Sequence, residues 1–544
     1  MASSSKLTSV NPLVSPMLTD MYQITMAYSY WCHGKQDEPA VYEMFFRKNP
    51  FKGEFTVFAG LEEVLAFVCN FKFTAEHLDY LRGQFSREFV ADPEKVERFL
   101  EWLGKVDCSK VRISSLPEGS VCFPRVPLLS VEGPLAVCQL LETPLLCLIN
   151  FATLIATNAS RFRLAAGPGM TLLEFGARRA QGPDGALSAS RYACLGGFDG
   201  TSNVLAGHLF GVKVSGTMAH AYVSSFSIDE ELPSSLLRSA DGTQEVDLME
   251  RSFAAVKQLA SSSQKTHLGE LKAFVAFAIS FPRNFLALVD TYDTIASGIP
   301  NFLAVASVLV ALGYKPKGIR LDSGDLAYLS REGRRLFREC SAKLSIDLSG
   351  CLIVASNDIN EATLHSLNQQ NHEINVFGIG TNLVTCQGQP ALGGVYKLVE
   401  IKGEPRIKLS EEAEKIPIPG RKNVYRLFGS AGIPLIDVMC RADEPAPVVG
   451  SQILCKHPFV EGKRCFICPT KVISLLEPVW AGKVLIPLPS LDEIKLQLSH
   501  QLSNMRADHL RPLNPTPYKV AVSSALYDYL HTLWMQEAPI RVLS

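Results

Sequence analysis

Carboxylates follow several apolar runs in the middle of the chain, each at the point where a run ends. If these runs are neighbouring parallel strands, the side chains meet around one cavity, where like charges need Mg²⁺, another cation or sugar hydroxyls between them. The alternative is that some only cap helices, which suits Asp322 and Asp358 because helical patterns follow both. Arg320 shares a strand face with Asp322, which slightly favours a ligand site. The five carboxylates belong to Asp290, Asp293, Asp322, Asp325 and Asp358.

Two glycine-containing segments have the composition of phosphate-binding loops. In Gly378-Ile-Gly-Thr381 the glycines would let the backbone approach an anion, and Thr381 would add a hydroxyl. Taken alone, this segment is better interpreted as an ordinary strand-to-loop turn. Gly393-Gly-Val-Tyr-Lys397 could form a second backbone cradle with a lysine close by, or a hairpin.

An arginine and a histidine also follow short apolar runs. Arg178 carries a planar, permanently charged guanidinium, which suits a phosphate, although an arginine on a surface turn is the simpler interpretation. His220 lies among small residues and could be a nucleophile, an acid or base, or a buried core histidine. Its position alone favours the core.

Four residues near the C-terminus have the ligand types of a structural zinc site. Cys455, His457, Cys465 and Cys468 are spaced irregularly for a zinc knuckle, however. With 14 cysteines in the chain, most of them inside apolar runs, chance proximity is the better explanation. Scattered thiols of this kind are typical of a reducing compartment, so the sequence predicts a cytosolic protein.

Strands and helices alternate in the region that carries these motifs. Apolar runs at 285–289, 318–321, 351–355 and 374–377 predict buried strands, and helical patterns cover 302–312, 326–337 and 359–367. This alternation predicts a parallel sheet, either open or closed into a barrel, with the active site at the carboxyl ends of the strands. Residues 13–150 mix short strands with helices, and the polar stretch 234–265 predicts a surface excursion or a pair of exposed helices.

Composition excludes several classes of protein. The 544 residues carry 53 Lys and Arg against 54 Asp and Glu, and 47% are hydrophobic, which argues against disorder and against a polybasic nucleic-acid binder. Charges and prolines interrupt the two most apolar stretches, 135–156 and 271–289, so neither is expected to span a membrane. Residues 1–12 lack the apolar core of a signal peptide and are expected to form a disordered tail.

With these segments in view, the sequence resembles the nicotinate phosphoribosyltransferase family. The resemblance implies a type II phosphoribosyltransferase fold, an irregular α/β barrel plus a discontinuous α/β sandwich domain. The implied domains are a tail (1–12), the N-terminal part of the sandwich (13–150), the barrel (151–400) and a C-terminal region that completes the sandwich and adds a smaller subdomain (401–544). The matching motifs are Leu18–Gln23, Glu174–Arg179, Gly196–Asp199 with Ser202–Val204, Gly216–His220, Arg320–Asp325, Gly378–Thr381 and Gly393–Lys397.

The resemblance also implies a reaction. Nicotinate and 5-phosphoribosyl 1-diphosphate would give nicotinate mononucleotide and diphosphate, coupled to ATP hydrolysis, as the first step of NAD biosynthesis from nicotinate. Mg²⁺ or Mn²⁺ would be held mainly by the diphosphate, and its protein ligands stay unknown. A homodimer with shared active sites is implied, in which the partner chain contributes Tyr22.

Roles for individual residues follow from motif position. His220 would be phosphorylated by ATP, which overturns the core interpretation of this histidine, and Arg178 and Asp322 would act beside it in catalysis. Nicotinate would contact Tyr22, Thr217 and Arg320, since an aromatic face can stack on the pyridine while a guanidinium pairs with the carboxylate. The residues expected to bind phosphoribosyl diphosphate are Gly378, Gly380, Thr381, Asp290 and Asn357.

Two alternatives remain at this point. A sibling enzyme that uses nicotinamide or quinolinate would share the barrel and the phosphate-binding groups. A catalytically silent relative that acts through protein contacts would be free to lose Arg178, His220, Arg320, Asp322 and Thr381, yet all five are intact.

Overall fold

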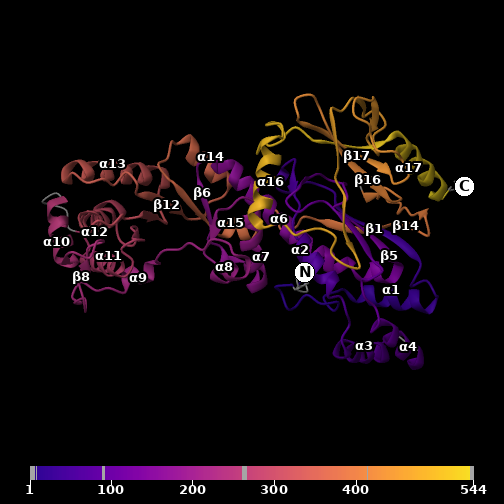
Figure 1. Cartoon of the computed structure of the whole chain (residues 1–544), viewed down its shortest axis with the longest axis horizontal. Coiled ribbons are helices and arrows are strands. Elements are labelled where there is room, and N and C mark those ends of the chain that lie inside the picture. Colours follow the sequence, from indigo (N-terminus) through magenta and orange to yellow (C-terminus); the bar gives the residue numbers. More distant parts are fainter. Residues whose placement is uncertain (1–6, 8, 89–91, 260–265, 413–414, 540–544) are drawn as a thin grey trace, which may run out of the picture. The chain divides into compact units, whose positions relative to one another are not determined.

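The structure is a computed structural model that describes residues 7, 9–88, 92–259, 266–412 and 415–539 (Figure 1). The chain divides into two compact units. The first unit contains the residues up to Asn158 and those from Gly388 onward, and the second contains Ala159 to Gln387. The middle of the chain therefore folds as one unit between two segments that fold together. The domain boundaries given above, after residues 150 and 400, stay a prediction.

The second unit is built on a parallel sheet of six strands. Each strand pairs in parallel with its neighbours, and the order is β10-β11-β12-β13-β6-β7. All carboxyl ends therefore lie at one edge of the sheet, as predicted. The strands are β10 (Leu286–Leu288), β11 (Gly318–Leu321), β12 (Leu352–Ser356), β13 (Val376–Ile379), β6 (Thr171–Glu174) and β7 (Gly200–Thr201).

Helices alternate with four of these strands, again as predicted. They are α12 (Ile299–Ala311), α13 (Leu326–Leu344) and α14 (Glu361–Gln369). The alternative that Asp322 and Asp358 only cap these helices is wrong, because the first turns are capped by residues further along the chain. Asp325 accepts a hydrogen bond from the Tyr328 N–H (2.9 Å), and Asn360 accepts one from Thr363 (2.8 Å). Asp322 and Asp358 are thus not the N-caps of these helices.

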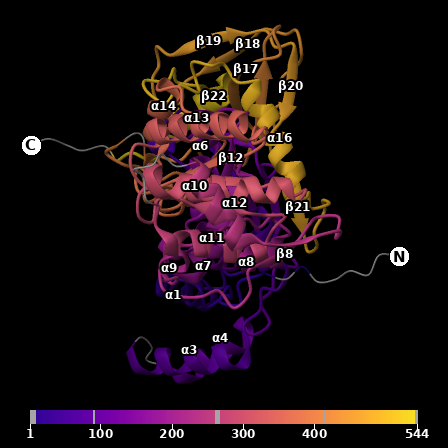
Figure 2. The same ribbon diagram turned by 90° about the vertical axis from the view of Figure 1, so that its left-hand side faces the viewer.

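The remaining elements of the second unit surround this core, and α10, α11 and α12 pack against one another (Figure 2). The polar stretch 234–265 was predicted as a surface excursion or two helices; it forms one hairpin and one helix, and residues 260–265 lie outside the described residues. The elements are η2 (Ala177–Arg179), α7 (Gly182–Leu195), α8 (Val204–Phe210), α9 (His220–Ser224), β8 (Leu236–Arg238), β9 (Glu245–Asp247), α10 (Leu248–Leu259), α11 (Leu268–Ser280), the π-helical turn η3 (Thr294–Gly298) and α15 (Thr381–Val384).

The first unit contains two larger sheets and a two-stranded ribbon. One sheet has the order β15-β14-β1-β5-β3-β21, and the other has the order β19-β18-β22-β17-β16-β20. The strands are β1 (Pro39–Phe46), β2 (Thr56–Val57), β3 (Arg112–Ser115), β4 (Val121–Cys122), β5 (Leu129–Pro134), β14 (Gly394–Ile401), β15 (Glu404–Pro405), β16 (Lys422–Phe428), β17 (Pro434–Arg441), β18 (Ile453–Lys456), β19 (Arg464–Ile467), β20 (Lys471–Ser474), β21 (Glu477–Ala481) and β22 (Lys519–Ser523).

Helices accompany these sheets in the first unit, and α6 continues along the chain from the first unit into the second. Of the predicted tail, residues 1–6 and 8 lie outside the described residues, while Ser9 donates a hydrogen bond to Glu63 on α2 (2.6 Å). The helices are α1 (Met21–Cys32), α2 (Leu61–Cys69), α3 (Ala75–Glu88), α4 (Pro93–Leu103), α5 (Leu135–Leu140), α6 (Glu142–Ala166), α16 (Leu491–Ser503) and α17 (Ser524–Glu537), with the 3₁₀ turn η1 (Pro50–Lys52).

The second glycine segment, 393–397, is neither a tight hairpin nor a turn. Gly394 begins β14, which pairs antiparallel with β1, and Lys397 lies opposite Glu43. A Cβ atom at Gly394 would lie 2.5 Å from the Asn150 side-chain oxygen. Close packing within the first unit therefore accounts for this glycine.

Two helical segments are apolar and long enough to cross a membrane. They are Leu135–Ala166 and Thr294–Ala311, and 61% and 67% of their most apolar windows lie buried inside the fold. Core helices of this length and composition meet the same test, so the two segments are weak evidence for a membrane protein.

A buried ion pair joins the two large sheets of the first unit. Lys422 on β16 donates to Glu43 on β1 (2.8 Å) and to two backbone oxygens, and both side chains are at most 2% exposed. Burial raises the pKa of Glu43 and lowers that of Lys422, which shows that the cost of desolvation outweighs their mutual attraction.

Breaking this pair from one side should destabilise the first unit. Lys422→Met leaves the Glu43 carboxylate buried without its partner, so we expect the free energy of unfolding to fall by about 3–5 kcal/mol. All four tryptophans belong to the first unit, so their fluorescence during urea titration measures its unfolding. The double variant Glu43→Leu/Lys422→Met should recover most of the loss. A double variant as unstable as the single one would contradict this account.

Candidate active site

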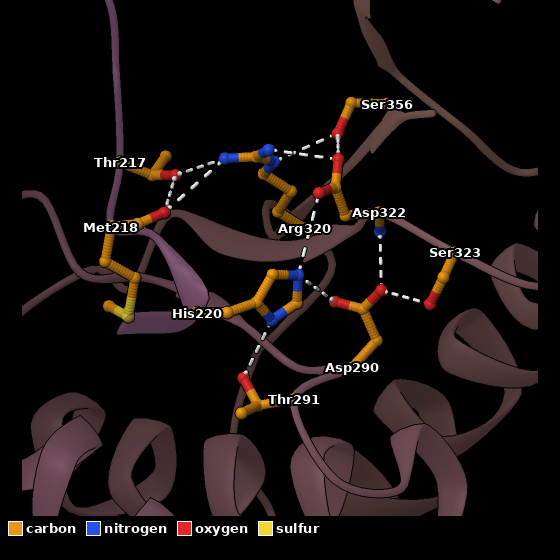
Figure 3. A network of polar contacts seen from close by, with 9 residues as sticks. All are labelled: Thr217, Met218, His220, Asp290, Thr291, Arg320, Asp322, Ser323 and Ser356. Carbon is orange, nitrogen blue, oxygen red and sulfur yellow. Dashed lines mark hydrogen bonds and ion pairs between the residues drawn. The ribbon is translucent and has the colours of Figure 1, made fainter. Parts of the chain in front are cut away.

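Polar side chains from three neighbouring strands meet at the carboxyl edge of the parallel sheet (Figure 3). Asp290 follows β10, Arg320 and Asp322 come from the end of β11, and Ser356 ends β12. His220 begins α9 beside them. The sequence therefore placed these motifs at the correct edge, because parallel pairing aligns the strand ends.

Arg320 is the most constrained side chain of the group. Its guanidinium donates to Ser356 Oγ and to Asp322 Oδ1, both at 3.0 Å. It also lies 3.4 Å from both Thr217 Oγ1 and the Met218 carbonyl. A planar guanidinium tied on several sides keeps one orientation, which suits the recognition of a flat carboxylate.

His220 is not a core residue, since its side chain is 44% exposed. Its Nδ1 lies 3.1 Å from the Thr291 hydroxyl, while Nε2 lies 3.6 Å from Asp322 Oδ2 and 3.9 Å from Asp290 Oδ1. Two carboxylates thus face one ring nitrogen. The exposed ring leaves room for a reacting group.

The two carboxylates differ in their surroundings. The Asp290 side chain is 2% exposed, and its Oδ2 accepts from the Asp322 N–H (3.0 Å) and the Ser323 hydroxyl (2.5 Å). No described residue donates a hydrogen bond to Asp290 Oδ1. Burial would raise the pKa of Asp322, but the Ser356 hydroxyl and the Arg320 charge outweigh it, so the pKa is lowered and the group is ionised at neutral pH.

A cavity of about 180 Å³ opens beside Arg320. Three arginines line it, together with two aspartates, so it suits an anion such as a phosphate group. The structure brings together here several residues that the sequence singled out from separate motifs. The lining residues are Phe175, Arg178, Arg179, Arg320, Asp322, Ser356, Asn357, Asp358, Gly378, Gly380 and Thr381.

The loops around this cavity are tightly packed. A Cβ atom at Gly378 would collide with the Phe175 ring, so packing accounts for this glycine, which was predicted to let the backbone approach an anion. Asn357 and Asp358 have φ angles of 117° and 45°, values that residues other than glycine rarely adopt. Strain of this kind gathers at ligand sites, where the surrounding structure maintains it.

Sequence reasoning assigned no role to a buried carboxylate beside this cavity. Glu174, at the end of β6, is fully buried and accepts hydrogen bonds from the Gly176 N–H, from Ser190 (2.8 Å) and from Thr201 (2.5 Å). It thereby fixes the turn that leads to Arg178. Its signal in the sequence was a charge that directly ends an apolar run. Ser356 and Thr291 were also missed, because isolated hydroxyls carry no pattern.

Comparisons with known proteins show the family to which the chain belongs. Residues 17–150 match the nicotinate phosphoribosyltransferase (NAPRTase) N-terminal domain family, and residues 421–530 match the nicotinate phosphoribosyltransferase C-terminal domain family. Nicotinate phosphoribosyltransferase 2 of Arabidopsis thaliana is 53% identical over 541 residues, which cover 97% of this chain and 96% of the relative. The chain belongs to the nicotinate phosphoribosyltransferase family.

Other members of the family support the same assignment. The nicotinate phosphoribosyltransferase of Homo sapiens is 46% identical over 531 residues, which cover 96% of this chain and 97% of the relative. The crystal structure of human nicotinic acid phosphoribosyltransferase, at 45% identity, superposes with a TM-score of 0.85 and covers 95% of this chain and 99% of the other. The predicted family, fold and enzyme class are therefore confirmed.

A more distant structure matches in fold alone. The crystal structure of nicotinate-nucleotide pyrophosphorylase from Pyrococcus furiosus has a TM-score of 0.57 at 20% identity, and the match covers 93% of this chain and 97% of the other. Together with the human structure, it is consistent with the type II phosphoribosyltransferase fold expected for the nicotinate phosphoribosyltransferase family.

Two groups of predicted residues lie outside this cluster. Tyr22 lies on α1 in the first unit and is 47% exposed, and its contact with nicotinate stays a prediction. Within the described residues, no group of three His, Cys, Asp or Glu side chains is arranged to hold a metal ion. Cys455 and Cys465 instead face each other on β18 and β19.

A second buried carboxyl, that of Glu270, lies beside the turn that follows Asp293. Glu270 on α11 is fully buried, and its Oε2 accepts from Ser297 (2.6 Å) and Asn301 (3.0 Å) around the π-helical turn η3. Burial raises its pKa to about 7, and Asp293 and Asp290 add to the effect. The folded protein therefore holds this proton more tightly than the unfolded chain, whose value is near 4.5.

This pKa shift predicts how stability depends on pH. Because folding raises the pKa of Glu270, the free energy of unfolding should fall by on the order of 3 kcal/mol as the pH rises from about 4.5 to about 7. Above this range it should stay at the lower value. Glu270→Gln has no group that titrates at this position. The melting temperature of the parent, measured by calorimetry, should therefore fall relative to that of the variant as the pH rises from 5 to 8. Glu250→Gln, at an exposed site on α10, is the matched control. A constant difference across this range would contradict the assignment.

Proposed function

We propose that this chain transfers the 5-phosphoribosyl group of phosphoribosyl diphosphate to nicotinate, with ATP hydrolysis coupled to the transfer. The observation that carries the proposal is the fixed guanidinium of Arg320 beside an arginine-lined cavity at the carboxyl edge of the sheet. The guanidinium suits the carboxylate of nicotinate, and the cavity suits the phosphates of the sugar donor.

In the proposed reaction the pyridine nitrogen attacks the anomeric carbon of the ribose. The bond from that carbon to the diphosphate oxygen breaks, so nicotinate mononucleotide and diphosphate are formed. Positive charge develops on the sugar ring and negative charge on the leaving group. Catalysis therefore depends on orienting the nucleophile and stabilising the diphosphate, with no proton transfer required.

Binding of nicotinate depends on the orientation of Arg320. Thr217 and Ser356 hold the guanidinium from two sides, and the Phe175 ring centre lies 5.6 Å from the guanidinium carbon. The pyridine can pack on an aromatic face while its carboxylate pairs with the guanidinium. We assign the second aromatic face to Tyr22 of a partner chain in a homodimer.

The phosphates of the sugar donor are assigned to the cavity. Arg178 and Arg179 supply positive charge for the diphosphate, while Gly380 and Thr381 supply backbone and hydroxyl groups for the 5-phosphate. Asn357 lines the same cavity. Asp290 and Asp322 are the candidates for contact with the ribose hydroxyls.

The same two aspartates fit a role in holding Mg²⁺ or Mn²⁺. Asp290 Oδ1 is buried without a hydrogen-bond donor among the described residues, and Asp322 is ionised at neutral pH. A cation of this class commonly binds one or two carboxylates together with substrate phosphates. When bound, it would neutralise charge on the diphosphate.

His220 is assigned as the group that accepts a phosphoryl group from ATP. A ring nitrogen would attack the γ-phosphorus, and ADP would leave; hydrolysis of the phosphohistidine then releases phosphate. The energy of this cycle would favour the conformation that binds substrates tightly. Since His220 lies 3.6 Å from Asp322, phosphorylation would change the charge beside Arg320. We place the reaction in the cytosol.

The substrate assignment is tested by mass-resolved product formation from phosphoribosyl diphosphate, Mg²⁺, ATP and either nicotinate or nicotinamide. We expect nicotinate mononucleotide only from the acid and faster with ATP. Arg320→Lys keeps the charge but loses the planar fork, so kcat/KM for nicotinate should fall at least about tenfold. Arg331→Lys on the exposed face of α13 should change nothing. Product from the amide would overturn the substrate, and product from neither would favour a silent relative.

The role of His220 is tested by removing its ring. His220→Ala should abolish stimulation by ATP while a weak ATP-independent transfer continues, because the residues around Arg320 are retained. The exposed His208 on α8 provides a matched control, and His208→Ala should remain stimulated. The measurement is the initial rate with and without ATP. Full stimulation of His220→Ala by ATP would show that another group accepts the phosphoryl group.

A further inference from the structure

The first unit contains a cavity that the proposed reaction does not use. Its volume is about 490 Å³, which falls within the range of small-molecule sites. Strands β17, β18, β19 and β22 contribute to its walls and lie side by side in one sheet (Figure 2). Every residue that lines it belongs to the first unit, whereas the arginine-lined cavity beside Arg320 belongs to the second.

One wall of this cavity is apolar and aromatic. Phe123 and Tyr518 stack with their ring centres 3.7 Å apart, and Ile436 and Ala521 extend the surface. The Tyr518 hydroxyl donates to Asp437 (3.0 Å), so its polar end is already occupied. Asp437 is in turn paired with Arg426 at 2.8 Å, so no net charge lies behind the wall.

Positive charge gathers along the lining of this cavity. Four cationic side chains line the cavity, and Glu54 is the one carboxylate among its lining residues. Since the chain as a whole has a net charge of −1, composition does not account for this excess. Lys463, Arg464 and Lys519 form no ion pair with any described residue. The cations come from three separate segments: Arg125, then Lys463 with Arg464, then Lys519.

A histidine adds a directed hydrogen-bond donor. His457 Nδ1 accepts from the N–H groups of Phe459 and Val460, both at 3.1 Å. Nδ1 is therefore unprotonated, and the ring proton of the neutral form lies on Nε2. Burial, Arg125 and Lys463 lower the pKa of His457, so this neutral form prevails at physiological pH.

Arg125 keeps its position through an unusual backbone conformation. Its φ angle is 72°, a region that residues with long side chains rarely adopt, and its N–H donates to the Phe46 carbonyl (2.8 Å). The guanidinium carbon lies 4.6 Å from the centre of the Phe459 ring. Strain maintained in this way, beside a cavity, is typical of ligand sites.

We propose that this cavity binds a small organic phosphate that also carries a planar ring, the class to which nucleotides belong. The phosphate would contact Arg125, His457 and Lys463, and the ring would pack on the wall formed by Phe123 and Tyr518. The site is separate from the one that performs the proposed reaction, and it does not depend on that proposal.

The test measures binding of AMP to the full chain by equilibrium dialysis. AMP is chosen because it has one phosphate and one ring system and is not a reactant of the proposed transfer. Lys463→Glu should weaken its binding at least tenfold, because the substitution places a negative charge in the lining of the cavity. Lys483→Glu makes the same charge change at an exposed site in the same unit, away from the cavity, and should bind AMP normally.

Three further arms decide where and how AMP binds. Arg178→Ala alters the cavity of the second unit and should leave AMP binding unchanged. Adenosine, which lacks the phosphate, and inorganic phosphate, which lacks the ring, should each bind at least tenfold more weakly than AMP. The proposal is overturned if Lys463→Glu binds AMP normally, if Arg178→Ala abolishes binding, or if inorganic phosphate binds as tightly as AMP.

Cysteine labelling gives a second measurement that needs no variant. Cys465 lines the cavity and is partly exposed, whereas Cys468 is exposed and lies outside the lining. AMP should slow alkylation of Cys465, followed by peptide mass spectrometry, and should leave the rate at Cys468 unchanged. Equal alkylation of Cys465 with and without saturating AMP would place the ligand elsewhere and overturn the proposal.

Discussion

The carboxylates of Asp290 and Asp322 lie at the same edge of a parallel sheet, so their mutual repulsion has to be offset for the chain to fold. Asp322 is balanced by the guanidinium of Arg320, and Asp290 accepts hydrogen bonds from the Asp322 backbone and from Ser323. His220 adds a ring that both carboxylates face. The same contacts that relieve the repulsion also fix Arg320 and His220 in place. Stability of the loops and preparation for substrate therefore depend on one set of interactions.

The fold of the second unit could be predicted because buried parallel strands are continuous apolar runs. All four runs proposed as strands around 285–377 became strands of one sheet. The helix caps could not be located, since several polar residues follow each strand and only geometry decides which one reaches the helix. Asp325 and Asn360 cap the helices for which Asp322 and Asp358 had been considered as one alternative. In the first unit, the strand beginning at Gly394 was not predicted, because its glycines suggested a phosphate cradle or a hairpin.

Candidate site residues could be predicted where the sequence has a motif, and not where tertiary contacts make the site. Arg178, Arg320, Asp322 and Thr381 line one cavity although they come from separate segments. Ser356, Thr291 and Glu174 contribute as much to the geometry, yet a hydroxyl or a single buried acid has no periodic signature. His220 shows the opposite case, because its small neighbours suggested burial while the chain leaves its ring partly open. The remaining roles stay predictions.

The discontinuous first unit also has a consequence for the order of events during synthesis on the ribosome. β1 pairs with β14, which the ribosome makes only after the whole second unit has been translated. At typical rates this delay is on the order of tens of seconds, during which one edge of β1 lacks its partner. An unpaired strand edge is prone to join other chains. The order of translation thus makes the N-terminal segment a natural client for chaperones, while the middle unit can complete its own sheet first.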